Sequence, residues 1–142
     1  MLTKSLWVPK KPFFTIAFFI WLVFVTYSSL ASFSGIDTDS YSFNIPYADK
    51  IVHFIFYSTA AFLGVFSLRE QKKWSVSKRK SFVLLFVFTV IFGIIIEVIQ
   101  YKFTTNREGD ILDALANSLG GLIGVLVCNF IFSNKGLLKW DT

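Results

Sequence analysis

The chain has 142 residues, of which 54% are hydrophobic, 19% aromatic and only 16% charged. Ordinary soluble domains carry roughly 45–50% apolar and about 25% charged residues, and so small a domain has too much surface to bury the excess. The composition excludes a disordered chain, and the single cysteine excludes a disulfide scaffold. The net charge of +5 is too small and too scattered to indicate a nucleic-acid binder. These values indicate an integral membrane protein.

Four long apolar segments follow one another along the chain. Because a helix rises 1.5 Å per residue, about 20 residues cross a hydrocarbon core of ~30 Å. The segments are continuous runs, not the short alternating segments of barrel strands. The third reaches this length only by taking Glu97 into the bilayer. We predict an all-α, polytopic membrane protein, a single domain over residues 1–142, with transmembrane helices at approximately 13–32, 48–68, 81–101 and 110–132.

The first apolar segment has a second interpretation. Three lysines precede it and Ser-Leu-Ala follows it, ending at Ala31, an order that also occurs in cleaved signal peptides. However, the apolar run is longer than a typical signal-peptide core, and Pro12 suits the first turn of a retained helix. We predict a retained helix and keep cleavage as the alternative.

Basic residues are distributed unevenly between the two sides of the predicted helices. Three of the fourteen, Lys50, Lys102 and Arg107, lie in or beside the first and third loops. The other eleven lie in the N-terminal segment, the second loop and the C-terminal segment: Lys4, Lys10, Lys11, Arg69, Lys72, Lys73, Lys78, Arg79, Lys80, Lys135 and Lys139. The positive-inside rule therefore predicts cytoplasmic termini, with the loop at residues 35–46 on the outer surface. The net charge thus marks topology and requires no nucleic acid.

Polar residues gather where the second and fourth predicted helices begin and the third ends. With the predicted topology, these three ends meet at the outer membrane face. Residues three or four apart share one face of a helix, so each helix presents a polar stripe. The stripes are Asp49, His53 and Tyr57, with Lys50 in the same first turn; Glu97 and Gln100; and Asp110, Asp113 and Asn117, with Arg107 just before the last. Carboxylates are unfavourable in a bilayer, which indicates that the cluster has a purpose.

Small residues continue two of these stripes toward the cytoplasm. They are Gly120, Gly121, Gly124 and Cys128 on the fourth helix, and Ala60 and Gly64 on the second. Small residues let transmembrane helices approach closely. We predict that the two stripes pack together and form the floor of an outward-facing polar pocket, with Cys128 as a small core residue and not a reactive thiol.

The spacing of the polar residues resembles that of the VanZ-like family, small bacterial membrane proteins named after an accessory factor in teicoplanin resistance. The similarity lies in Asp49-Lys50-x-x-His53, Glu97-x-x-Gln100 and Arg107-x-x-Asp110-x-x-Asp113-x-x-x-Asn117-x-x-Gly120-x-x-x-Gly124. One departure is that Thr105-Asn106 stands before Arg107 where a Pro-Gly-like turn is expected. The resemblance implies the bacterial plasma membrane and a glycopeptide-resistance-like accessory role, but it supplies no substrate.

The acidic residues allow two interpretations. Asp110 and Asp113 could bind Mg²⁺ or another hard divalent cation together with Glu97 or Asp49, because carboxylates at i and i+3 share a helix face. Alternatively, they pair with the neighbouring basic residues or cap the fourth helix. A divalent cation is the one cofactor that this pattern suggests.

The remaining polar residues have similar alternatives. His53 could be a general base or a metal ligand, or a hydrogen-bond partner that holds two helices together. Arg107 could bind the phosphate of a lipid or precursor, or pair with an acidic residue. Gln100 and Asn117 are predicted to form interhelical hydrogen bonds.

Two functions of different classes follow. The first is an accessory protein that binds a membrane lipid or a lipid-linked cell-wall precursor; its candidate ligand-binding residues are Lys50, Gln100, Arg107, Asp110 and Asn117. The second is a membrane-embedded enzyme acting on a phosphate-containing lipid or precursor; its candidate catalytic residues are Asp49, His53, Glu97 and Asp113. A transporter ranks third, because four helices would have to oligomerise to enclose a path.

Overall fold

The computed structural model describes residues 12–31, 47–71, 76–103, 110–133 and 136–140. Its regular elements are four helices: α1 (Phe13–Leu30), α2 (Ala48–Glu70), α3 (Lys78–Phe103) and α4 (Ile111–Ile131). All four are long and apolar enough to cross a membrane. No strand occurs in these ranges. The predicted all-α fold with four transmembrane helices is therefore confirmed.

The helix bounds differ from the predicted ones by only a few residues. α3 begins at Lys78 instead of residue 81 and continues to Phe103, so it includes three basic residues in its first turn. Charged residues can extend a transmembrane helix where it leaves the hydrocarbon, and hydrophobicity alone does not detect this extension. The predicted outer loop at residues 35–46 lies outside the described residues.

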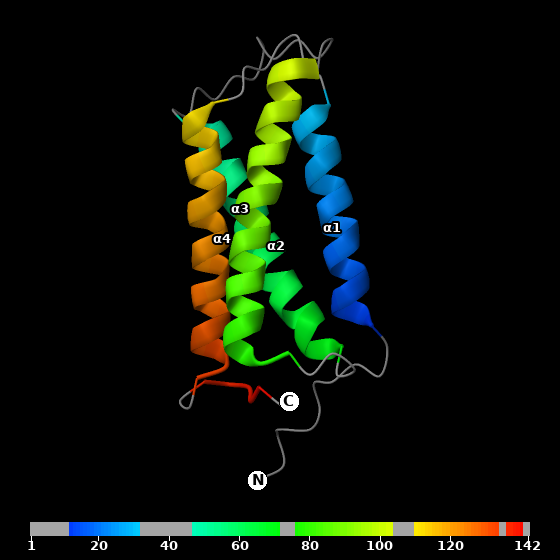
Figure 1. Cartoon of the computed structure of the whole chain (residues 1–142), viewed down its shortest axis with the longest axis vertical. Coiled ribbons are helices and arrows are strands. Elements are labelled where there is room, and N and C mark those ends of the chain that lie inside the picture. Colours follow the sequence, from blue (N-terminus) through cyan, green and yellow to red (C-terminus); the bar gives the residue numbers. More distant parts are fainter. Residues whose placement is uncertain (1–11, 32–46, 72–75, 104–109, 134–135, 141–142) are drawn as a thin grey trace.

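The helices run side by side, and each is antiparallel to the next along the chain (Figure 1). The most extensive helix pair is α2 with α4, and α2 also packs against α1 and α3. α1 is the least buried of the four. The beginning of α1 and the end of α4 lie at the same end of the bundle (Figure 1). We call this the basic end and the opposite end the cluster end.

Glycines on α4 bring it close to α2. A Cβ atom added to Gly120 would meet the backbone of Phe54, and one added to Gly124 would meet the backbone of Ser58. The prediction that small residues of α4 allow close packing against α2 is thus confirmed for Gly120 and Gly124, whereas it is wrong for Gly121, whose Cβ would meet Thr89 of α3. The part concerning Gly64 is wrong: a Cβ there would meet Leu85 of α3 and Phe18 of α1, because this face of α2 turns away from α4.

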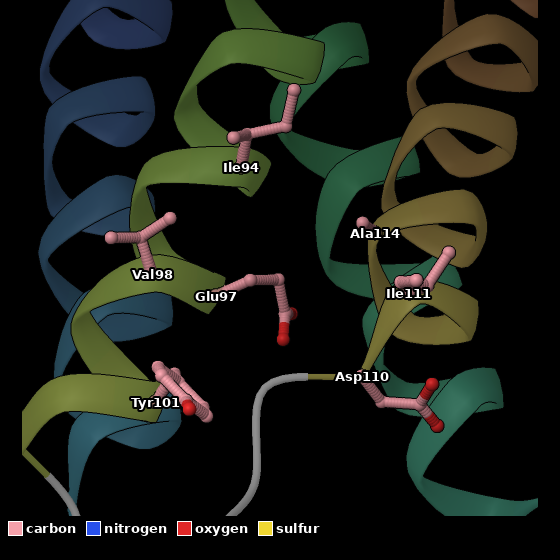
Figure 2. Close-up of a pocket in the computed structure, with 7 residues that line it drawn as sticks. All are labelled: Ile94, Glu97, Val98, Tyr101, Asp110, Ile111 and Ala114. Atoms are coloured by element: carbon pink, nitrogen blue, oxygen red, sulfur yellow. The ribbon is translucent and has the colours of Figure 1, made fainter.

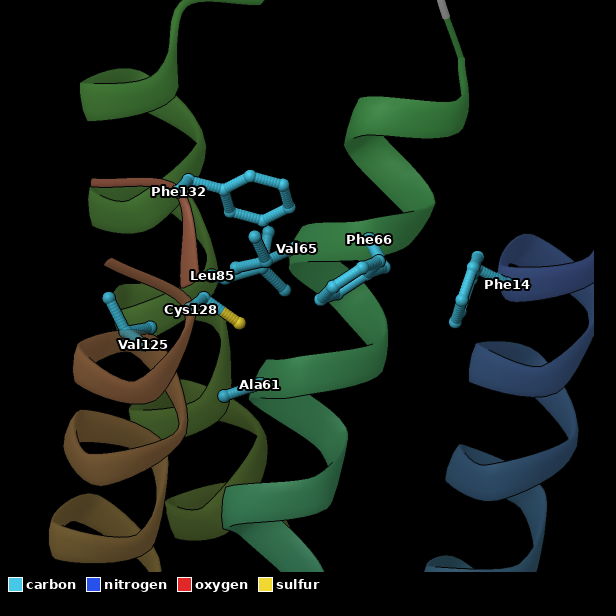
Figure 3. Packing of buried hydrophobic residues seen from close by; sticks show 8 residues of the cluster. All are labelled: Phe14, Ala61, Val65, Phe66, Leu85, Val125, Cys128 and Phe132. Atoms are coloured by element: carbon cyan, nitrogen blue, oxygen red, sulfur yellow. The ribbon is translucent and has the colours of Figure 1, made fainter. Parts of the chain in front are cut away.

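The apolar core lies toward the basic end, where side chains from all four helices meet (Figure 3). Phe14 of α1 packs on Phe66 of α2, with ring centroids 4.8 Å apart. Cys128 is fully buried in this core, as predicted for a small packing residue. The outward faces of the helices expose large apolar side chains, as expected of surfaces that face lipid.

The first turn of α1 is capped by a side chain from α2. Pro12, the N-cap residue, makes no side-chain capping bond. Instead, the Glu70 carboxylate accepts hydrogen bonds from the backbone N–H of Phe14 at 3.3 Å and of Thr15 at 2.9 Å, and from the Thr15 hydroxyl at 3.0 Å. This contact anchors α1 to α2 at the basic end.

Candidate functional site

The polar stripes of α2, α3 and α4 meet at the cluster end and form two layers. The outer layer surrounds Lys50 at the beginning of α2. Its Nζ lies 2.9 Å from Asp49, 3.0 Å from Asp110 and 3.0 Å from Asp113. The exposed fractions of the carboxylate side chains fall from 58% for Asp49 to 42% for Asp110 and 11% for Asp113. Lys50 therefore links α2 to the beginning of α4, and Asp113 leads toward the buried layer.

Asp110 also performs the capping role that was one of its two predicted alternatives. It is the N-cap residue of α4, and its Oδ1 accepts a hydrogen bond from the backbone N–H of Leu112 at 2.9 Å. This hydrogen bond, together with the one from Lys50, holds the pKa of the Asp110 carboxyl below its ordinary value of 3.8. Asp110 is thus a charged group at the mouth of the site.

The inner layer is a buried hydrogen-bond chain across three helices. His53 Nδ1 of α2 lies 3.0 Å from Asn117 Oδ1 of α4, and Asn117 Nδ2 donates to Glu97 Oε1 of α3 at 3.2 Å. The amide nitrogen of Asn117 thus faces Glu97, and its oxygen faces His53. Because an amide oxygen only accepts, this contact uses the tautomer of His53 in which Nδ1 is the donor. The interhelical role predicted for Asn117 is present.

Only one of the two carboxylate oxygens of Glu97 has a well-placed hydrogen-bond partner, although the residue is only 7% exposed. Oε1 accepts from Asn117 and lies 3.5 Å from His53 Nδ1. Oε2 has no hydrogen-bond partner of good geometry within the described part of the chain, where only the backbone N–H of Asp110 approaches the carboxylate; the buried hydroxyl of Tyr57 has no partner there either. Buried polar atoms are normally well paired, so this carboxylate oxygen can still accept a further partner.

A group suited to a metal ion lies where the two layers join. His53, Glu97 and Asp113 are all buried, and each offers a ligand atom within 4.8 Å of the others. The sequence pattern predicts a cation site of Asp110 and Asp113 with Glu97 or Asp49. Among the described residues, the group that could hold a metal contains His53 in place of Asp110, because Asp110 faces Lys50 and the backbone of α4.

A cleft of about 210 Å³ lies between α3 and α4. Its lining residues are Ile94, Glu97, Val98, Tyr101, Asp110, Ile111 and Ala114. Figure 2 shows the Glu97 side chain reaching from α3 into the space beside α4. Ile111 and Tyr101 are exposed at 80% and 71%, so the cleft is open at the molecular surface. The apolar lining residues were not predicted, since they resemble the lipid-facing residues around them.

Gln100 and Arg107 complete the predicted set. Gln100 is buried and donates from Nε2 to the backbone oxygen of Ser29 at 2.7 Å, so it connects α3 to the end of α1. It thus forms the predicted interhelical hydrogen bond, with a backbone oxygen as the acceptor. Arg107 lies outside the described residues.

These features define a polytopic α-helical membrane protein with a layered polar site at one end of its bundle. The sequence model of the VanZ/LLP1 family matches residues 7–132. The chain therefore belongs to the VanZ/LLP1 family, which confirms the resemblance inferred from the motif spacing. Searches of curated proteins and of solved structures found no match.

Proposed function

We propose that this protein binds the head group of an envelope lipid or a lipid-linked cell-wall precursor in the bacterial plasma membrane, in an accessory role. The α3–α4 cleft carries the proposal. Its walls are apolar and exposed, whereas Glu97 and Asp110 place carboxylates at its inner side and mouth. A ligand with an apolar chain and a polar head matches both parts of this lining.

The exposure of the lining residues supports entry from the bilayer. Ile94 and Val98 on α3 are 50% and 47% exposed, and they belong to a helix face that a membrane would cover with lipid. An acyl or prenyl chain could remain in the hydrocarbon beside these residues. Its head group would then reach the carboxylates without crossing the helix bundle.

The distribution of basic residues supports an outward-facing site. Basic residues gather at the basic end, in the last turn of α2 and the first turn of α3. The described ones include Arg69, Lys78, Arg79 and Lys80. Lys50 and Lys102 are the described basic residues of the cluster end. By the positive-inside rule, both termini are cytoplasmic and the cluster end faces outward, where envelope precursors are used.

A pair of matched variants tests lipid binding. Ala114→Leu adds volume to the lining of the cleft, whereas Ala116→Leu adds the same volume on α4 outside the lining. Native mass spectrometry would measure retention of phosphatidylglycerol and of undecaprenyl phosphate, each added separately. We expect Ala114→Leu to lower retention of at least one lipid about tenfold and Ala116→Leu to retain it. Equal retention by both variants and the wild type would refute the proposal.

A membrane-embedded enzyme is the second candidate, favoured by the buried group of His53, Glu97 and Asp113 beside the cleft. Such a combination offers acid–base groups or metal ligands for chemistry at a phosphate. Incubation with a retained lipid, followed by mass analysis of that lipid, distinguishes the candidates. A changed head group that depends on Glu97 would indicate catalysis, whereas retention of an unchanged lipid supports the accessory role.

A further inference from the structure

We infer that His53, Glu97 and Asp113 form a binding site for a divalent transition-metal ion at the inner side of the α3–α4 cleft. The three residues come from three different helices, and their ligand atoms lie within 4.8 Å of one another. Atoms bound tetrahedrally to one ion at about 2.0–2.2 Å lie roughly 3.3–3.6 Å from one another. Side-chain rotations that shorten the separations by up to about 1.5 Å therefore bring all three to one ion.

The donor set selects the kind of ion. Imidazole nitrogen suits zinc, iron and similar ions, whereas carboxylates also suit manganese. Mg²⁺ and Ca²⁺ prefer sites made of oxygen alone, so a histidine in a set of three disfavours them. One imidazole and two carboxylates thus favour Zn²⁺ or Mn²⁺. Three protein ligands also leave a coordination position for a further group, and Glu97 borders the cleft from which that group would come.

The unpaired oxygen of Glu97 is the second observation that points to a ligand. The chain from His53 through Asn117 to Glu97 satisfies Oε1 and would suffice as a structural link between helices. It leaves Oε2 without a partner of good geometry in the described structure, although only 9% of the side chain is exposed. A cation would satisfy this oxygen. Asn117 would then hold two ligands from behind, as second partners commonly do at metal sites.

The charge balance supports the same conclusion. Within the described part of the cluster, four carboxylates (Asp49, Glu97, Asp110 and Asp113) face one ammonium group, that of Lys50. With His53 neutral, the excess is three negative charges, and a divalent cation lowers it to one. A bound cation would therefore also make the site more favourable for a phosphate head group. This last consequence rests on the proposed function, whereas metal binding itself does not.

The test measures the metal alone. The protein would carry a streptavidin-binding tag instead of a histidine tag, be treated with EDTA and be placed in phosphatidylcholine nanodiscs. Equilibrium dialysis with elemental analysis would measure binding of Zn²⁺, Mn²⁺ and Mg²⁺. We expect one Zn²⁺ or Mn²⁺ per chain and at least about tenfold weaker binding of Mg²⁺. His53→Gln and Asp113→Asn should each weaken Zn²⁺ binding at least about tenfold. Ser118→Ala, which removes only a hydrogen bond to Ala114 within α4, should alter it less than about threefold.

A spectroscopic measurement on the wild type keeps the proposal testable if the variants do not fold. Mn²⁺ bound to the protein should show the magnetic coupling of a ligating imidazole nitrogen in pulsed electron paramagnetic resonance. Since His53 is the single histidine, this signal identifies the site. Absence of stoichiometric metal, absence of the nitrogen signal, or an equal loss in Ser118→Ala would overturn the proposal. Lipid retention in EDTA, measured in parallel, reports on the proposed function separately.

Discussion

The contact between α2 and α4 can be tested by adding one methyl group. In Gly120→Ala, the new Cβ would meet the carbonyl oxygen of Phe54, with the carbonyl carbon at 3.0 Å and Cα at 3.1 Å. These are backbone atoms of a helix and cannot rotate away. Because ordinary carbon contacts are about 3.5–4.0 Å, the helices must separate by roughly 0.5 Å or more.

This separation has a packing effect and an effect on the site. Overpacking of this kind destabilises by about 1–3 kcal/mol. Phe54 is adjacent to His53, and Gly120 lies one turn from Asn117, so the 3.0 Å contact between His53 and Asn117 would also stretch. Loss of that hydrogen bond adds about 0.5–1.5 kcal/mol. We expect Gly120→Ala to lower the free energy of unfolding by about 2–4 kcal/mol.

Reversible unfolding in mixed micelles, followed by circular dichroism, would measure this change. Gly121→Ala is the close comparison, because its Cβ would meet the side chain of Thr89, which can turn aside only by giving up its hydrogen bond to Phe86; its expected loss is about 0.5–1.5 kcal/mol. Ser118→Ala removes only a bond to Ala114 within α4 and is the control. The reasoning fails if Gly120→Ala stays within about 0.5 kcal/mol of the wild type, or if Gly121→Ala is equally destabilising.

Three further predictions concern other polar contacts. Asn117→Ala leaves the buried Glu97 without its donor and should lower the free energy of unfolding by about 1–3 kcal/mol. Glu70→Ala removes the cap of α1 and should lower it by about 0.5–2 kcal/mol, with faster amide exchange at Thr15. Because the folded-state pKa of Asp110 lies below its ordinary 3.8, its carboxylate stabilises the fold above about pH 4, and this contribution is lost as the pH falls. Asp110→Asn should therefore show a flatter stability profile between about pH 5 and pH 3.

Each of these three predictions has a control that could contradict it. Ser118→Ala is the control for Asn117→Ala, and equal losses in the free energy of unfolding would show that the hydrogen bond to Glu97 contributes nothing. For the α1 cap, exchange in α4 should stay unchanged; a uniform increase would indicate global destabilisation. For the acid profile, a wild-type slope that persists in Asp110→Asn would assign the pH dependence to other carboxylates.

The helices were predictable because a bilayer imposes a simple requirement on sequence. A chain that crosses it needs about 20 apolar residues per helix, and hydrophobic length reports this directly. The faces of the helices were also predictable: Asn117 and Gly120 share one face of α4, and both contact α2 in the structure. Periodicity indicates which residues share a face but not which helix that face meets. Gly64 illustrates this limit, since its neighbours are Leu85 and Phe18.

The contacts of the polar residues were less predictable, because they depend on the rotation and depth of each helix. Glu70 lies beyond the predicted end of the second helix at residue 68, yet it caps α1 from 55 positions away along the chain. Asp110 and Asp113 have equivalent chemistry in the sequence, but only Asp113 faces His53 and Glu97 closely enough to share an ion. No periodic pattern reports such a difference in direction.

The depth of the two layers explains why one charged cluster can combine a structural and a ligand-binding role. Lys50 and Asp49, with side chains 19% and 58% exposed, remain near water, where ion pairs form and break at little energetic cost. His53 lies one turn deeper in α2, and Glu97 faces it from α3. Their side chains are only 8% and 9% exposed. At this depth an unpaired charge costs free energy, so a group that neutralises the charge of the inner layer stabilises the folded protein. A ligand that acts on this protein should therefore exert its largest effect on stability through Glu97, and the outer ion pairs should contribute mainly to its orientation.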